Sequence, residues 1–452
     1  MNTLTKDLIA ILCLLAMLLC VPVTLIAAEY KDAEDTAPKS VDDIDNMLEN
    51  IAGTILLART PVIDAIDEWR RKRGPFWRDG NVKFNFRTMD FEGEIGNFFE
   101  TQAWAAPGEI AYRSGQWRDF LTLGASVYGS YELSGTEFPG ATGMLQLDGD
   151  NITTLGQAYF EFGWKGLTGR FYRQSLDFPY LNRNDSRMIP NTFEAYGFAR
   201  EGTDLDFYLG YVDKIKLRNR EDFIAMSEAA GVAGGGSGTS AAGILWSPPD
   251  ANFSWGASVQ QTSDVFRLIY TEVDWKRSIN GWGARISAQY SHQESIGEEL
   301  IGTLDTGAFG LKASGSYRDV VMSLAYTETD DNAKIKSPFG GRPGYTSSML
   351  RDFDRAGEEA WRVGLSYHFD ALGLPGWSGN INYTSGRNAV NDDFPIQLSD
   401  NREIDYTLDF KPDNGRWAGL WLRIRYANVR EDGSGEVANQ LRLIVNYSLT
   451  VL

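Results

Sequence analysis

The stretch GLWLRIRYANVRE, residues 419–431, shows the pattern that decides the fold of this chain. Its apolar and cationic residues alternate: the apolar set is Leu420, Leu422, Ile424 and Tyr426, and the cationic set is Arg423 and Arg425. Successive side chains of a β-strand point to opposite faces of a sheet, so the pattern predicts a strand with one apolar and one cationic face. A soluble sandwich and a membrane barrel can each contain such a strand, and the rest of the chain distinguishes them.

The same alternation of apolar and polar residues returns from residue 82 to the end of the chain. Clear examples are the segments 82–87, 121–128, 282–290, 361–369 and 441–447. Strands of about ten residues with this period cross the bilayer in outer-membrane barrels. Counting such segments predicts about 18 strands, enough for a barrel whose lumen holds water and small solutes.

The connections between these segments alternate between short and long. Short ones lie at residues 164–166, 247–252, 370–376 and 411–415, and long polar ones at residues 132–152, 175–191, 213–239 and 329–358. Short turns on one rim and long loops on the other are typical of outer-membrane barrels. We therefore expect an all-β fold, a transmembrane antiparallel β-barrel. An Arg on its lipid face would cost about 2–4 kcal/mol, so the cationic parity is expected to face the lumen.

The N-terminus has the pattern of a secretory signal peptide. Lys6 precedes an apolar run from Leu8 to Ala27, and the small residues Ala27 and Ala28 end it. This order of charged, apolar and small residues predicts a signal peptide over residues 1–28, although the run is also long enough for a membrane anchor.

Residues 29–80 are expected to form a periplasmic extension that precedes a barrel domain of residues 81–452. Apolar residues recur at spacings of three and four from Ile44 to Trp69, which predicts an amphipathic helix that Pro61 would kink. Three roles are open for this helix. It would pack on the periplasmic rim of the barrel, form a stalk that joins subunits into a homo-oligomer such as a trimer, or act as a plug.

Composition excludes several kinds of chemistry. The balance of 61 Asp and Glu against 43 Lys and Arg gives a net charge of -18, which argues against binding of nucleic acid. Both cysteines lie in the predicted signal peptide, and the only histidines are His292 and His368. We therefore expect no metal site, no cofactor and no catalytic residues. The rival interpretations are an outer-membrane barrel hydrolase, for which no G-x-S-x-G or H-E-x-x-H motif is found, and a structural or adhesive barrel.

Residues 170–196, RFYRQSLDFPYLNRNDSRMIPNTFEAY, resemble the third loop of the OprD family of outer-membrane porins. That loop carries a similar Asp-Ser-Arg-hydrophobic-hydrophobic-Pro-x-Thr-Phe stretch. Residues 352–377, 422–432 and 439–449 extend the resemblance, which covers residues 82–452. It implies a barrel in the bacterial outer membrane, in contact with lipid and lipopolysaccharide, whose third and seventh loops fold inward as a narrow eyelet. It also implies passive, partly selective diffusion of small carboxylate-bearing solutes: amino acids, short peptides and organic acids.

Two sets of candidate site residues follow. Position by position, the resemblance places Asp185, Ser186 and Arg187 in the third-loop part of the eyelet, and Tyr345, Ser348 and Asp352 in the seventh-loop part. With Asp177, the acids Asp185 and Asp352 would oppose the arginines and orient zwitterions in a transverse field. The cations with lumen parity form a predicted basic ladder: Lys83, Arg87, Arg170, Arg285, Lys312, Arg362, Arg423, Arg425 and Arg442. Such a ladder would bind carboxylates, or its members would pair with the lumen acids Glu161, Glu272, Asp405 and Asp409 and brace the wall.

Overall fold

The structure is a computed structural model. It describes residues 74–95, 99–136, 138–392, 394, 396–415, 417–433 and 435–450, together with Glu68 and Lys72. The predicted signal peptide and almost all of the predicted helical extension, with its role in a trimer, lie outside these residues. Among the residues that the structure describes, no helix is long and apolar enough to span a membrane.

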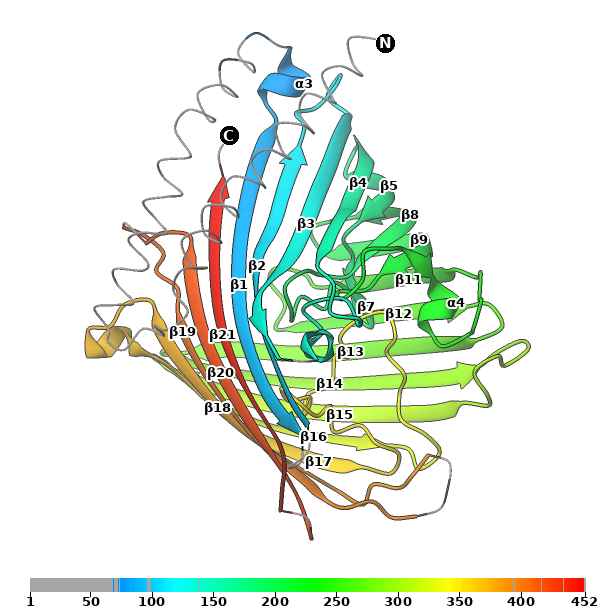
Figure 1. Cartoon of the computed structure of the whole chain (residues 1–452), viewed down its shortest axis with the longest axis vertical. Coiled ribbons are helices and arrows are strands. Elements are labelled where there is room, and N and C mark those ends of the chain that lie inside the picture. Colours follow the sequence, from blue (N-terminus) through cyan, green and yellow to red (C-terminus); the bar gives the residue numbers. More distant parts are fainter. Residues whose placement is uncertain are drawn as a thin grey trace.

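The described chain forms a closed antiparallel barrel of 18 strands, which confirms the predicted fold (Figure 1). Each wall strand pairs with its neighbour in the wall, and β1 pairs with β21 to close the cylinder. The two-residue strand β10 (Ile224–Ala225) adds only a short pairing on β9. The wall strands are β1 Asn81–Ile95, β2 Phe99–Arg113, β3 Leu121–Gly135, β4 Ile152–Trp164, β5 Leu167–Gln174, β8 Thr192–Arg200, β9 Leu205–Lys216, β11 Thr239–Trp246, β12 Phe253–Thr262, β13 Phe266–Ile279, β14 Trp282–Ser295, β15 Asp305–Tyr317, β16 Val320–Thr329, β17 Glu359–His368, β18 Trp377–Arg387, β19 Asn401–Phe410, β20 Leu420–Glu431 and β21 Gly435–Thr450.

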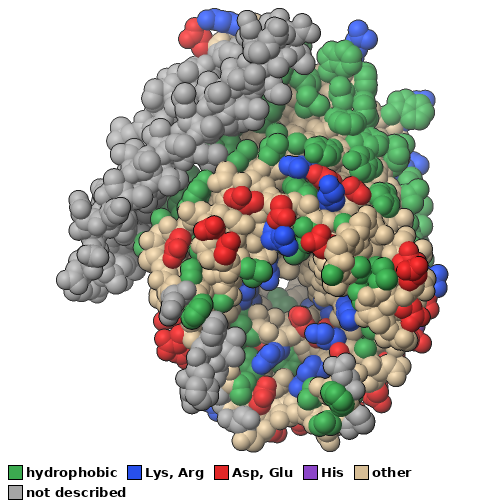
Figure 2. All heavy atoms as spheres, turned by 45° about the vertical axis from the view of Figure 1, so that its right-hand side comes forward, with side chains coloured by type: hydrophobic (Ala, Val, Ile, Leu, Met, Phe, Trp, Pro, Cys, Tyr) green, Lys and Arg blue, Asp and Glu red, His purple; other side chains and the backbone are tan. Residues whose placement is uncertain are grey.

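The two faces of the wall differ as the alternation predicted. On β20, Ile424 and Tyr426 are 46% and 38% exposed on the outer face, whereas Arg425 lies directly opposite Arg442 of β21 on the inner face. In Figure 2, hydrophobic side chains gather on the upper right part of the molecule. Closing the sheet leaves no edge strand in the described wall, which matters because hydrocarbon offers no hydrogen bonds to the backbone.

The short-turn rim carries the short helix α3 (Pro75–Arg78) and the end of β21. Its tightest turns have positive φ at both central residues, as in Asn280 (52°) and Gly281 (80°), which is the type I′ geometry that suits the twist of paired strands. The opposite rim carries the long loops. The predicted alternation of lengths has exceptions there, because β12 and β13 are joined by only residues 263–265 and β20 and β21 by only residues 432–434.

A pair of neighbouring residues on β16 tests which face meets lipid. Leu324 is 47% exposed on the outer face, and Ser323 has the inward parity. We expect Leu324→Arg to lower the free energy of unfolding in lipid vesicles by about 2–4 kcal/mol, because it places a guanidinium in hydrocarbon. Ser323→Arg, the matched control, adds the same charge toward the lumen and should cost much less. Equal losses in urea-induced unfolding would contradict the assignment of the faces.

Candidate functional site

The third loop, residues 175–191 between β5 and β8, lies inside the barrel. It contains a small hairpin of β6 (Asp177–Phe178) and β7 (Leu181–Asn182). The Tyr180 hydroxyl is 2.6 Å from Ser291 Oγ on β14, and Gln260 Nε2 on β12 donates to the Pro179 carbonyl. These contacts carry the loop inward from its own strands to β12 and β14, further round the wall.

The seventh loop, residues 330–358 between β16 and β17, follows the inner wall from β13 to β19. Its Tyr345 hydroxyl donates to Glu272 Oε2 at 3.2 Å, and its Ser348 Oγ is 2.7 Å from Thr384 Oγ1. The buried carboxylate of Glu403 accepts the N–H groups of Leu350 (2.8 Å) and Arg351 (2.9 Å). Side chains of the wall therefore hold this loop inward.

The two loops join each other in the lumen through Asn182. Its Nδ2 donates to the Gly341 carbonyl at 2.8 Å, and its Oδ1 accepts the Gly341 N–H at 2.8 Å. Gly340 permits this approach, because a Cβ there would lie 2.6 Å from the same Oδ1. The contact links the two loops inside the barrel, where the family resemblance predicts the eyelet, and Figure 2 shows a hollow in this face of the molecule with Lys, Arg, Asp and Glu side chains around it.

Four arginines come together beside the third loop: Arg187 on the loop, Arg218 just after β9, and Arg425 and Arg442 on the wall. We call them the arginine cluster. Within the described residues, the hydrogen bonds of Arg187, Arg218 and Arg442 go to neutral oxygens, including Thr142 O, Asn184 Oδ1 and Gln440 Oε1. No described acceptor contacts the buried Nε of Arg425.

The cluster concentrates positive charge that its surroundings only partly offset. The guanidinium carbons of Arg187 and Arg442 lie 5.1 and 5.6 Å from the centroid of the Phe91 ring. Burial, and then the charges of Arg218 and Arg425, lower the pKa of Arg187 to about 9. Burial also lowers the pKa of Arg218, although the carboxylate of Asp352 opposes this effect. An anion entering the cluster would relieve this repulsion and accept its hydrogen bonds.

Most other members of the predicted ladder have acidic or carbonyl partners. Arg423 donates to both oxygens of Asp409 at 2.7 and 3.0 Å. Arg285 lies 2.6 Å from Asp274, and Arg170 shares Glu161 with Arg113. The remaining members are Arg87, which bonds Asp185 at 2.5 Å, Arg362, which donates to Ser347 O, Lys312, which lies 5.9 Å from the Tyr345 ring centroid, and Lys83, which is exposed near the short-turn rim.

Some of the predicted eyelet residues lie at the arginine cluster, and others form ion pairs with a neighbouring cation. Ser186 accepts a hydrogen bond from Arg218, and Arg187 belongs to the arginine cluster. Asp185 and Asp177 form direct ion pairs with Arg87 and Arg183, the second at 2.8 Å. The charges of these two carboxylates are thus neutralised locally.

The sequence interpretation missed several inward-facing cations, among them Lys216, Arg113 and Arg218. Arg113 has the same parity as Glu109 and the opposite parity to Ile110 and Tyr112. The alternation of this strand could therefore have identified Arg113 as inward-facing. Arg218 lies in the loop after β9, where strand parity has ended. Nothing in its local sequence indicates that it bonds to Ser186 of another loop.

Comparison with known proteins agrees with this architecture. The family model described as "outer membrane porin, OprD family" matches residues 76–451. The chain is 24% identical over 370 residues to the porin-like protein GalP of Pseudomonas putida, a match that covers 78% of this chain and 87% of that protein. Pseudomonas aeruginosa OccK9 (OpdG) superposes with a TM-score of 0.75 at 22% identity, covering 83% of this chain and 100% of OccK9. OpdK of the same organism, solved with vanillate, gives a TM-score of 0.74 at 22% identity, covering 82% and 99% of the two chains.

Proposed function

The chain belongs to the OprD family of outer membrane porins, and we propose that it is a channel for passive, partly selective diffusion of small solutes that bear a carboxylate. Its barrel lies in the bacterial outer membrane. The solute class comprises amino acids, short peptides and organic acids. Vanillate, which occupies the related OpdK structure, is itself a small carboxylate.

The arginine cluster is the observation that carries this proposal. A guanidinium stays charged and can hold a carboxylate through two parallel hydrogen bonds, a geometry that a neutral solute cannot match. Arg425 and Arg442 face each other across adjacent strands at this point. The paired cations Arg423 and Arg285 would then act as weaker binding sites along the wall, so that a solute moves on without being trapped.

A channel accounts for the site better than a barrel hydrolase does. His368 ends β17 at the short-turn rim, whereas His292 lies toward the long-loop end of β14, with its Nε2 3.9 Å from Asp305 Oδ1. The chain's two histidines are therefore placed at different ends of the barrel. A structural or adhesive barrel would not need a cluster of arginines whose positive charge is only partly offset, since burying such charges lowers the stability of the protein.

Planar-bilayer recordings with matched solutes test the proposal. We expect benzoate to inhibit the chloride current of the full-length protein in a saturable manner, because it occupies the arginine cluster, and benzyl alcohol at equal concentration to inhibit it at least about tenfold more weakly. The proposal is wrong if the neutral compound and the carboxylate inhibit the current alike.

A further inference from the structure

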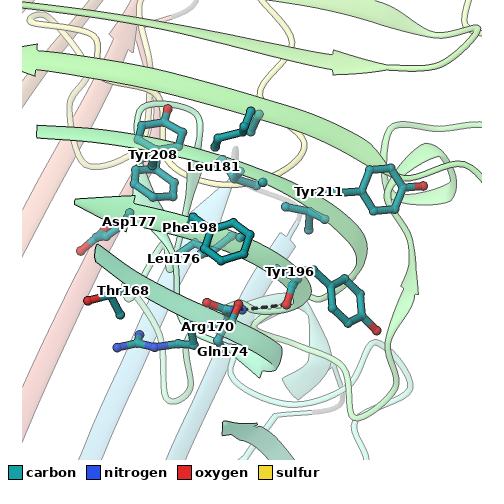
Figure 3. Close-up of a pocket in the computed structure, with 18 of the residues that line it drawn as sticks. Thr168, Arg170, Gln174, Leu176, Asp177, Leu181, Tyr196, Phe198, Tyr208 and Tyr211 are labelled. Atoms are coloured by element: carbon teal, nitrogen blue, oxygen red, sulfur yellow. Dashed lines mark hydrogen bonds between the residues drawn. The ribbon is translucent and has the colours of Figure 1, made fainter. Parts of the chain in front are cut away.

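The inner wall contains a recess of about 570 Å³ that lies apart from the arginine cluster (Figure 3). It is bounded by β5, β8, β9 and β11, and the first half of the third loop lies over it. It extends from Leu181 of that loop to Gly166 and Glu201 in the short turns. A solute that leaves the predicted eyelet toward the short-turn rim would pass this recess.

Strand register explains why the wall is hollow here. One row of directly opposed inward positions runs from Arg170 through Gly197 and Gly210 to Ala241, across β5, β8, β9 and β11. The two glycines lack side chains and are closely packed, because an added Cβ would come within 3.1 Å of the Leu209 carbonyl oxygen at Gly197 and within 3.0 Å of the Tyr196 carbonyl oxygen at Gly210. The absence of larger side chains along this row leaves space between the wall and the third loop.

The surface of the recess is largely apolar and includes a fixed aromatic pair. Phe178 of the third loop stacks on Tyr208 of β9, with ring centroids 3.6 Å apart and an interplanar angle of 15°. Leu176, Leu181 and Val212 add aliphatic surface. Figure 3 shows the rings of Tyr196 and Tyr211 pointing away from this space, so these two residues contribute mainly backbone.

One edge of the recess carries charge that can orient an anion. Arg170 and Arg113 both contact Glu161, so the group has two cations for one anion. Asp177 is paired with Arg183 at 2.8 Å, and Glu201 lies at the end nearest the short turns. An anion is therefore favoured near Arg170 and disfavoured near Glu201.

We propose that this recess is a second solute site, which binds the flat apolar ring of an aromatic monocarboxylate while its carboxylate contacts Arg170. The inference rests on the proposed function, because it assumes that carboxylates enter the lumen. The ring leaves water by packing on Phe178 and the small residues of the wall. A short aliphatic acid would contact Arg170 alone and gain nothing from the recess.

Filling the recess tests the proposal with full-length protein in detergent. Ala199 of β8 and Thr168 of β5 lie directly opposite each other and line the recess. We expect Ala199→Leu to raise the Kd of benzoate, measured by titration calorimetry, about tenfold, and to leave the inhibition of chloride current by acetate unchanged. Thr168→Leu should have the same effect, and it replaces Ala199→Leu as the test if the Ala199→Leu protein does not fold into the barrel. Ala257→Leu, on the outward parity of β12 beside Trp255 and Val259, is the matched control.

The outcomes separate the two proposals. If the filling variants weaken the binding of benzoate and of acetate equally, or weaken the binding of neither, the recess does not bind the ring and the inference is overturned. If the unaltered protein does not distinguish benzoate from benzyl alcohol, the proposed function itself fails. Arg170→Gln should weaken the inhibition of the chloride current by benzoate and leave the inhibition by benzyl alcohol unchanged. An equal effect on both compounds would also overturn the inference.

Discussion

Replacing Arg425 and Arg442 together by alanine is expected to abolish the preference of the channel for carboxylates over neutral solutes. These residues face each other on β20 and β21, and Arg425 Nε has no acceptor within the described residues. Each hydrogen bond to a charged group contributes about 1.5–3 kcal/mol, so each lost guanidinium should weaken carboxylate binding by roughly tenfold to a hundredfold. Inhibition of the chloride current by benzoate, compared with benzyl alcohol, measures the effect.

The matched control removes a cation that already has a partner. Arg423 shares the inner face of β20 with Arg425 but is bonded to Asp409, whose carboxylate also accepts Trp421 Nε1 at 2.7 Å. The double variant Arg423→Ala/Asp409→Asn removes this pair without changing the net charge and should reduce selectivity only slightly. If it reduced selectivity as much as the Arg425/Arg442 variant does, the whole ladder, and not the arginine cluster, would set selectivity.

Replacing Asn182 by alanine is expected to widen the predicted eyelet. The substitution removes both 2.8 Å hydrogen bonds to Gly341 and leaves the N–H and carbonyl of that residue without this partner. Two such bonds contribute about 2 kcal/mol, which is enough to let the third and seventh loops separate for an appreciable fraction of the time. Single-channel recordings should show a larger mean conductance and more frequent transitions between levels.

An asparagine in the seventh loop provides the control for that experiment. Asn332 Nδ2 donates to the Asp305 carbonyl at 3.1 Å, a bond between the seventh loop and its neighbouring strand that does not involve the third loop. Asn332→Ala should leave the conductance unchanged. A folded Asn182→Ala protein with the conductance of the unaltered channel would show that the contact between the loops does not set the aperture.

The wall of the barrel was predictable because its signal is local. A lipid-facing Ile424 next to a lumen-facing Arg425 follows from the period of a strand and from the cost of charge in hydrocarbon. The turn at Asn280 and Gly281 also has a local cause, since both residues tolerate positive φ. The resemblance of residues 170–196 to a known loop added the inward course of that segment.

The candidate site was predictable only in part, because its members meet through contacts distant in sequence. Parity placed Arg423 and Arg425 on the same face, yet it could not show that Asp409 pairs with Arg423 and not with Arg425. Asn182 and Gly341 are separated by 159 positions, and no pattern in either loop indicates their contact. Arg218 was missed for the same reason, because its role depends on where Ser186 lies after both loops have folded.

By itself, the sequence determined that this chain closes into a barrel with an apolar outside and a charged inside, because alternation along a strand is a property of adjacent residues. Only the tertiary structure decided which of the inward cations remain available to a solute. That outcome depends on the register between strands and on the loops packed inside them, which bring acids to Arg285 and Arg423 and bring further arginines to Arg425 and Arg442. Charge is encoded locally, whereas its compensation is a matter of distance in three dimensions.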